Sequence, residues 1–110
     1  WSLGTRPWDE MPSIEQREMG HACEWETSMI MRIAPQLVRD DVALAEIPFG
    51  IPFLPASRAW ITKERSDRGH IGKPHLATEE KGEHLLACFA ADVRSLLHRM
   101  RKWDGHSWEG

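Results

Sequence analysis

The sequence predicts one small domain that combines two helices with one short strand. Three observations lead to this interpretation. A long apolar stripe with helical spacing spans residues 85–100, a shorter one spans residues 29–38, and residues 58–64 hold the best strand candidate. The chain has 110 residues, of which 41% are apolar and 28% charged, as in ordinary globular domains and unlike disordered tails. No apolar run approaches the roughly 20 residues that a bilayer span needs, which rules out a membrane span, and no membrane partner is expected.

The first twenty residues are rich in glycine and proline, which predicts mostly loop with at most one short helix near residues 13–19. A helical stripe follows from Glu24, with Thr27 or Ser28 as its cap. Proline disfavours the helical conformation of the residue before it, so this helix should end or kink before Pro35. Pro35 can itself begin a following turn.

The middle of the chain is less regular. Residues 42–47 fit either a short strand or one helical turn, and the pattern does not decide between them. Prolines recur through residues 47–55, and each removes a donor from a strand ladder, so an ordered loop with apolar anchors is expected there. Residues 58–64 are then predicted to form the strand, before a loop rich in glycine and proline.

The C-terminal helix has the clearest signals and is predicted over residues 78–102. Thr78 is a suitable N-cap, and Glu79 and Glu80 lie where the helix dipole favours negative charge. Gly82 lies inside the helix at a cost of about 1 kcal/mol relative to alanine, which indicates a close packing contact. Burying so long a stripe requires a sheet or several helices, and the other predicted elements offer too small a core for it.

Charge and cysteine content limit the possible partners and the compartment. The net charge is −3, and neither half of the chain has the dense basic stripe of a nucleic-acid-binding protein. The sequence starts at Trp1 without a secretory signal, which favours a cytoplasmic location and predicts that Cys23 and Cys88 are free thiols. His21 and Cys23 alone lack the paired spacing of a zinc site.

The segment that precedes the first helix carries the most ionisable groups. His21, Glu24 and Glu26 follow Gly20, which permits a close backbone approach. A histidine and two carboxylates at such a junction can ligate a metal or act as an acid–base pair. Composition alone favours the simpler alternative, in which both carboxylates are solvated first-turn acids and His21 is a loop residue.

Two motifs resemble the creatininase (creatinine amidohydrolase) family. Residues 21–38 begin with His-Ala-Cys-Glu-Trp-Glu-Thr-Ser and end with Pro-Gln-Leu-Val, similar to the family signature His-Ala/Gly-Gly-x-x-Glu-Thr-Ser and its following helix. Residues 69–82 resemble the family segment that opens the long C-terminal helix, with Gly69, Gly72, Pro74 and the run Glu80-Lys81-Gly82. Cys23 stands where the family has glycine, which affects only the freedom of the local backbone.

The resemblance implies a metal-dependent hydrolase of cyclic or other non-peptide amides. It implies an α/β fold of three layers, with helices around a mainly parallel sheet, assembled as homo-oligomers such as hexamers. A small-molecule amide would be the substrate, and two divalent ions (zinc, manganese or iron) would polarise its carbonyl and supply a hydroxide.

Residue roles follow from the resemblance position by position. His21 matches the histidine that contacts substrate and passes a proton to the leaving nitrogen, a role that suits the usual imidazole pKa near 6.5. Trp1 matches an aromatic residue that closes over substrate. Glu26 matches a candidate to ligate metal or to orient His21. Arg17 and Glu18 replace the Trp-Asp pair of creatininase, which argues against creatinine itself as substrate.

The principal metal-ligand motifs of the family, Glu-x-His…Asp and Asn-Gly-His-x-x-Asn, do not occur in this sequence. We therefore expect residues 1–110 to be the C-terminal portion of a single creatininase-like domain, incomplete on its own, inactive in isolation and without a bound metal. The alternative is a truncated, non-catalytic module that acts in binding or oligomer assembly.

Overall fold

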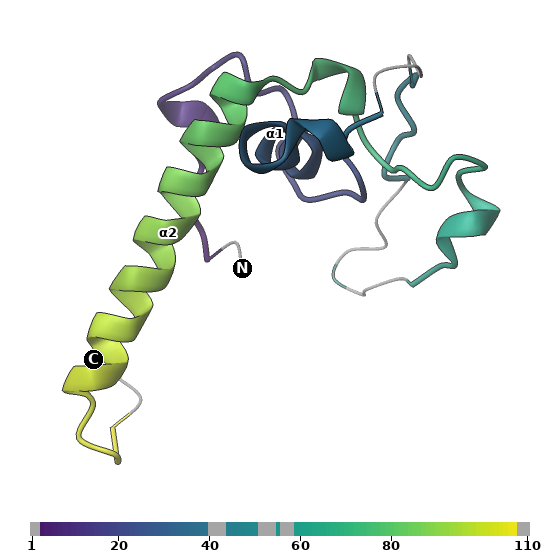
Figure 1. The fold of residues 1–110 in the computed structure, drawn as a ribbon. Coiled ribbons are helices and arrows are strands. Elements are labelled where there is room, and N and C mark those ends of the chain that lie inside the picture. The colour runs from purple at the N-terminus through teal and green to yellow at the C-terminus, as the bar shows by residue number, and fades with distance from the viewer. Residues whose placement is uncertain (1–2, 40–43, 51–54, 56–58, 108–110) are drawn as a thin grey trace.

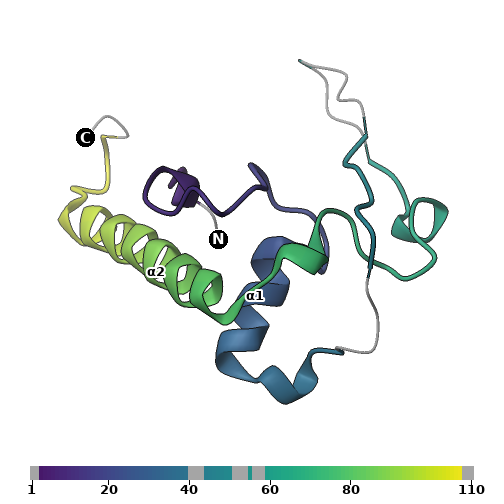
Figure 2. The ribbon, with the colours of Figure 1, turned by 90° about the horizontal axis from the view of Figure 1, so that it is seen from above.

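The computed structural model describes residues 3–39, 44–50, 55 and 59–107, and in these residues two helices cross. Helix α1 spans Glu24–Ile33 and helix α2 spans Glu79–Lys102. Helix α1 packs against the N-terminal half of α2, whereas the C-terminal half of α2 extends away from the other elements (Figure 1). The described loop at residues 59–70, drawn in teal, lies on the side of α1 that faces away from α2 (Figure 1 and Figure 2). The described residues also form four single-turn 3-10 helices: η1 (Pro7–Asp9), η2 (Pro35–Leu37), η3 (Thr62–Glu64) and η4 (Pro74–Leu76).

Both helices match their predicted positions, with one correction at the start of α1. The N-cap is Cys23, and Thr27 and Ser28 lie inside the helix instead of capping it. The Ser28 hydroxyl donates to the carbonyl of Glu24 at 2.5 Å. The predicted break is confirmed, because α1 ends at Ile33 and Pro35 opens η2.

The start of α2 is also as predicted. The Thr78 hydroxyl accepts a hydrogen bond from the amide of Lys81 at 3.1 Å. Glu79 and Glu80 occupy the first turn, near the positive end of the helix dipole.

The predicted strand at residues 58–64 is wrong for the residues that the structure describes there. Residues 59–61 have no regular structure, and Thr62–Glu64 form η3, closed by a 2.9 Å bond from the amide of Arg65 to the carbonyl of Thr62. The guanidinium of Arg65 stacks over Trp60, with 4.7 Å between its carbon and the ring centroid. A single extended segment has no neighbouring strand to pair with its backbone N–H and C=O groups. The β-propensity of these residues therefore does not lead to a strand.

No sheet is present among the described residues, although an α/β fold requires one. Strand-like pairing is confined in that part of the chain to two isolated antiparallel bridges, His21 with Ile71 and Ile47 with Gly72. Residues 42 and 43 of the ambiguous segment, and part of the expected loop at 47–55, lie outside the description. Residues 44–46 have no regular structure, and Pro48 and Phe49 lie in a loop whose carbonyls accept bonds from Arg65.

The described residues 3–20 are mostly loop, as predicted, but their one short helix is η1 (Pro7–Asp9) and not residues 13–19. The amides of Glu15 and Gln16 donate to the side-chain carboxylate of Glu24, at 3.1 and 2.8 Å to its Oε2, instead of to backbone carbonyls one turn earlier. A long-range partner thereby replaces local helical bonding.

The start of the N-terminal segment is tied to α2 by Asp92, which accepts hydrogen bonds from the amides of Leu3 and Thr5 and from the Thr5 hydroxyl. These bonds hold the pKa of Asp92 below its ordinary value, the bond from the Thr5 hydroxyl contributing most.

The core lies at the helix crossing and is small. Trp25 is at its centre, with its ring centroid 6.0 Å from that of Trp8 and 5.8 Å from that of Phe89. Each fully buried apolar side chain contributes roughly 1.5–3 kcal/mol. The cluster of buried residues consists of Ile14, Cys23, Trp25, Met29, Leu85 and Phe89.

The surface left uncovered by this core is large. On α2, Leu97 is 58% exposed and Met100 is 61% exposed, beyond the point where the other elements end. The radius of gyration is 16.4 Å, against about 13 Å for a compact domain of this length. The expectation of a core too small for its surface is therefore confirmed. None of the helices in the described residues has the length and apolar character needed to cross a membrane.

Gly82 is a point of close contact between α2 and α1. A Cβ atom at this position would lie 2.0 Å from the carbonyl oxygen of Ser28 and 2.9 Å from the Cβ of Arg32. The obstacle is mainly backbone, which cannot rotate away. The close contact predicted from a glycine inside the helix is confirmed.

Gly82→Ala should therefore destabilise the fold by about 1–3 kcal/mol, because overpacking outweighs the gain in helix propensity. Urea denaturation monitored by circular dichroism measures the change. Ser95→Ala, on the exposed part of α2, is the control and should be neutral or slightly stabilising. Equal stability of Gly82→Ala and the parent chain would contradict the crossing geometry.

Candidate functional site

His21 is held by its backbone and presents its side chain to solvent. Its amide donates to the carbonyl of Ile71 at 2.9 Å, and the amide of Ile71 donates back at 2.7 Å. A Cβ on Gly20 would lie 2.0 Å from the Ile71 carbonyl oxygen, so only glycine permits this approach. The His21 residue is exposed, whereas Ile71 is buried. The two segments thus fix the position of His21 without covering its imidazole.

Ala22 links His21 to α1 through a left-handed backbone conformation. Its φ is +45°, which is uncommon for a residue with a side chain and costs conformational energy. The Ala22 carbonyl accepts a bond from the Thr27 hydroxyl at 3.1 Å. The sharp turn falls on Ala22, while Cys23 is extended with φ −90°, so a cysteine in place of the family glycine is accommodated.

Glu24 is completely buried, and its carboxylate accepts hydrogen bonds from two segments, the N-terminal loop and α2. Its Oε1 accepts from Lys81 Nζ at 2.7 Å, and its Oε2 accepts from the amide of Gln16 at 2.8 Å. Lys81 is only 7% exposed and also donates to the carbonyl of Leu76 at 2.7 Å. The interpretation of Glu24 as a solvated first-turn acid is therefore wrong, and the carboxylate is not available to a metal or substrate.

Gln16 completes what we call the polar cluster, which consists of Gln16, Glu24 and Lys81. Its Oε1 accepts from the amide of Glu24 at 3.0 Å and from the amide of Lys73 at 2.7 Å. Gln16 is 3% exposed. The cluster therefore joins the N-terminal loop, the start of α1, the glycine-proline loop and α2 at one point.

Glu26 is arranged differently from Glu24. Its Oε2 is buried and has no hydrogen-bond partner. Buried carboxylate oxygens without a donor are costly, so such an atom marks a place where a donor could bind. Glu26 lines a pocket of about 460 Å³ between α1 and the segments around η2 and η4, whose walls are Ala22, Glu26, Thr27, Ile30, Met31, Leu37, Val38, Arg39, Leu44, Pro74, His75 and Ala77.

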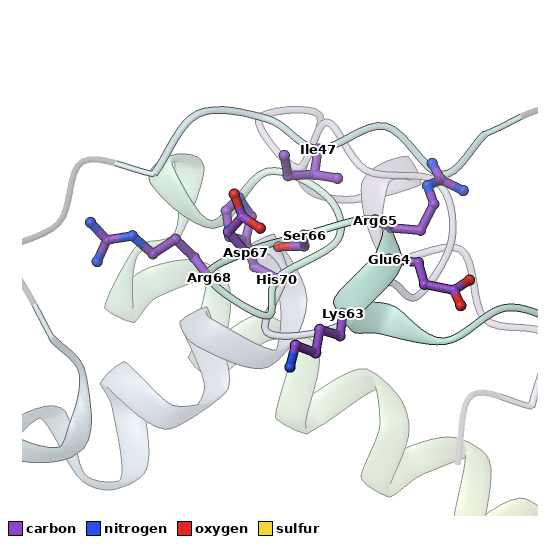
Figure 3. Close-up of a pocket in the computed structure, with 8 residues that line it drawn as sticks. All are labelled: Ile47, Lys63, Glu64, Arg65, Ser66, Asp67, Arg68 and His70. Carbon is purple, nitrogen blue, oxygen red and sulfur yellow. The ribbon is translucent and has the colours of Figure 1, made fainter.

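A second pocket, of about 400 Å³, lies in the loop around η3 (Figure 3). Its charged side chains, among them Lys63, Glu64 and Arg68, point in different directions instead of converging (Figure 3). His70 is buried there, and its Nε2 lies 2.7 Å from the carbonyl of Ala45. This contact requires the ring proton on Nε2, so His70 helps to hold the loop together.

The two cysteines are free thiols, as predicted. Cys88 Sγ lies 3.5 Å from His84 Nε2, which suggests a nucleophile and its base. However, the same nitrogen lies 2.9 Å from the carbonyl of Pro7 and must carry a proton to bond it. Burial raises the pKa of the Cys88 thiol, so neither group is prepared for nucleophilic catalysis.

The predicted site residues are only partly brought together. Ala22, next to His21, shares the first pocket with Glu26, but among the described residues no hydrogen bond joins His21 to Glu26. Trp1 lies outside the described residues. In the same part of the chain, no three His, Cys, Asp or Glu side chains are grouped as a metal ion would require. The described residues therefore offer Glu26 as a single candidate ligand and do not form a metal site.

Comparison with known proteins identifies the family. The family model described as Creatininase, creatinine amidohydrolase, matches residues 1–97. The chain belongs to the creatininase family. No curated protein and no solved structure matches it.

Within this creatininase-family chain, the two sequence motifs face each other. His21 bonds to Ile71, Glu24 pairs with Lys81, and Ser28 Oγ accepts from the amide of Thr78 at 3.1 Å. Gln16 and Lys81 are the residues that sequence reasoning missed. Lys81 and Glu24 lie in opposite motifs, and their opposite charges are a signal that could have paired them.

Replacing Lys81 alone should cost about 3–5 kcal/mol of stability, because Lys81→Met leaves Glu24 buried without its counter-charge. The double variant Glu24→Gln/Lys81→Met should be more stable than Lys81→Met, since the uncompensated charge is gone. Urea denaturation at neutral pH measures both. A double variant less stable than Lys81→Met would contradict this account of the pair. Arg32→Met, which breaks the exposed ion pair with Glu83, is the control and should leave the stability nearly unchanged.

Proposed function

We propose that this chain provides the substrate side of a metal-dependent amidohydrolase that cleaves the C–N bond of a small-molecule amide. The supporting observation is the setting of His21. Its backbone is fixed by two bonds to Ile71 and by the strained turn at Ala22, while its side chain stays exposed. A histidine that is positioned by its neighbours and open to solvent can meet a substrate without reorganising the fold.

In this proposal His21 acts as the proton carrier. Imidazole exchanges protons near neutral pH, and amide cleavage requires a proton on the departing nitrogen. His21 would deliver that proton. The polar cluster would hold the His21 segment in position, because it anchors Glu24, three residues further along the chain. Trp1 is proposed to contact the substrate as well.

The family resemblance also implies zinc, manganese or iron. When bound, such a divalent ion would polarise the scissile carbonyl and lower the pKa of a bound water. Because the family ligand motifs are absent from the sequence, we propose that a separate metal-binding half carries the ligands and the mainly parallel sheet. The resulting α/β protein would be a cytoplasmic homo-oligomer. Glu26 is the described residue that could join the ligand set.

In the protein expressed from its complete reading frame, His21→Ala should lower kcat for amide hydrolysis by about 10²–10⁴-fold, the usual contribution of a general acid or base. Metal content, measured by atomic emission, should be nearly unchanged, because the proposed role is proton transfer. His98→Ala, at an exposed imidazole on α2 outside the pocket, is the matched control and should leave kcat unchanged. Normal turnover in His21→Ala would remove the proposed catalytic role.

A second candidate function is oligomer assembly without catalysis. The observation that favours it is the exposed apolar stripe on the C-terminal half of α2, including Val93, Leu97 and Met100. In this case the creatininase-like fold would serve as a binding module, and a second copy would cover the stripe.

If copies of the chain assemble through this stripe, Leu97→Gln with Met100→Gln should shift the protein toward monomer in sedimentation velocity. The expected cause is the loss of apolar area that is buried on association. Ile61→Gln, at an exposed apolar residue outside the stripe, should not change the distribution. A parent chain that stays monomeric across the accessible concentration range would contradict self-assembly.

A further inference from the structure

The C-terminal half of α2 presents an apolar face that the other described elements leave open. Val93, Leu96, Leu97 and Met100 recur at spacings of three, four and seven residues from Val93, which places them on one side of the helix. The four residues, which we call the α2 stripe, are between 38% and 61% exposed. We propose that the α2 stripe binds an acidic amphipathic helix of another protein.

The α2 stripe continues the core of the fold along the same face of α2. Leu85 and Phe89 are buried, and Val93 follows at the same spacing of four residues. Beyond this point α2 extends past the other elements (Figure 1). A helix laid along α2 on the side where α1 packs would therefore extend the core. A flat lipid surface fits less well, because α1 occupies this same face nearer the start of α2 and would hold a plane away from the stripe.

The charges beside the stripe define the chemistry of the partner. Residues 93–102 are all exposed and contain no Asp or Glu. Their cationic residues are Arg94, Arg99, Arg101 and Lys102. Arg94 lies three residues before Leu97 and Arg101 lies four residues after it, so both border the stripe. Charges at such bordering positions determine which helices pair. An acidic helix would cover the stripe with its apolar side and place carboxylates opposite the bordering cations.

The same charges distinguish this inference from the second candidate function, in which another copy of the chain covers the stripe. In an antiparallel pair of α2 helices, Arg94 of one copy would approach Arg101 of the other. In a parallel pair, each arginine would approach its own equivalent. Like charges brought together in this way oppose association, whereas an acidic partner avoids both contacts. The inference requires no hydrolysis, so it stands independently of the amidohydrolase proposal.

Two synthetic peptides test the inference on the 110-residue chain. Both have leucine at the a and d positions of each heptad, and they differ only in carrying glutamate or lysine at the e and g positions beside that seam. Binding is measured through the fluorescence anisotropy of the labelled peptide. We expect the glutamate peptide to bind about tenfold more tightly than the lysine peptide, because several modest ion pairs act together. Added salt should reduce this preference.

Variants separate the apolar part of the surface from its charges. Leu97→Gln with Met100→Gln should weaken binding of the glutamate peptide about tenfold or more, because less apolar area is buried. Arg94→Gln with Arg101→Gln should instead remove most of the preference for glutamate over lysine. Ile61→Gln, at an exposed apolar residue outside the stripe, is the control and should bind like the parent chain. Circular dichroism checks that every variant is folded.

Several results would overturn the inference. Equal binding of the two peptides would remove the role of the charges. Self-association through the stripe that excludes the glutamate peptide would assign the surface to a second copy. Binding to phosphatidylserine vesicles, but not to the peptide, would assign it to lipid if Leu97→Gln with Met100→Gln abolishes that binding. Failure of the protein expressed from its complete reading frame to bind the glutamate peptide would show that the rest of that protein covers the stripe.

Discussion

The buried ion pair between Glu24 and Lys81 is the constraint on which the rest of the site depends. Both charges are removed from water, which is tolerable only because each has further partners. Glu24 also accepts from the amides of Glu15 and Gln16, and Lys81 donates to the carbonyl of Leu76. Glu24 stands in the first turn of α1, where the helix dipole adds favourable potential. These directional contacts define how α1, α2 and two loops meet, which the small apolar core alone would leave less specific.

The same contacts explain why two motifs that are distant in the sequence occur together. Residues 21–28 and 69–82 form the two sides of one interface, with the His21–Ile71 bridge at one end and the contact of Gly82 with Ser28 at the other. We therefore expect a change on either side to alter the position of His21, even where the changed residue touches no substrate. This is a physical reason for the residue types at Gly20 and Gly82, where a Cβ atom would meet a backbone carbonyl oxygen at 2.0 Å.

Local signals predicted the helices well, and long-range contacts account for the errors. Pro35 and Thr78 act through neighbouring residues, so the end of α1 and the cap of α2 could be predicted, and the cost of a glycine inside a helix indicated the close contact at Gly82. The loop at residues 13–19 could not, because its amides bond to Glu24 instead of forming a helical turn. At the site, His21 and Glu26 could be named from the motif, but the burial of Glu24 and the role of Gln16 depend on packing that no local pattern encodes.

The contrast between Glu24 and Glu26 shows how two carboxylates in one helical turn come to differ in chemistry. Residues two apart on a helix do not face each other. Glu24 therefore points into the crossing, where Lys81 and two amides satisfy it, and Glu26 lines the pocket on another side of α1. A donor supplied from within the fold makes Glu24 a structural residue. The Oε2 of Glu26, by contrast, is buried without a hydrogen-bond partner, so the two carboxylates of this turn have different surroundings although the sequence places them two residues apart.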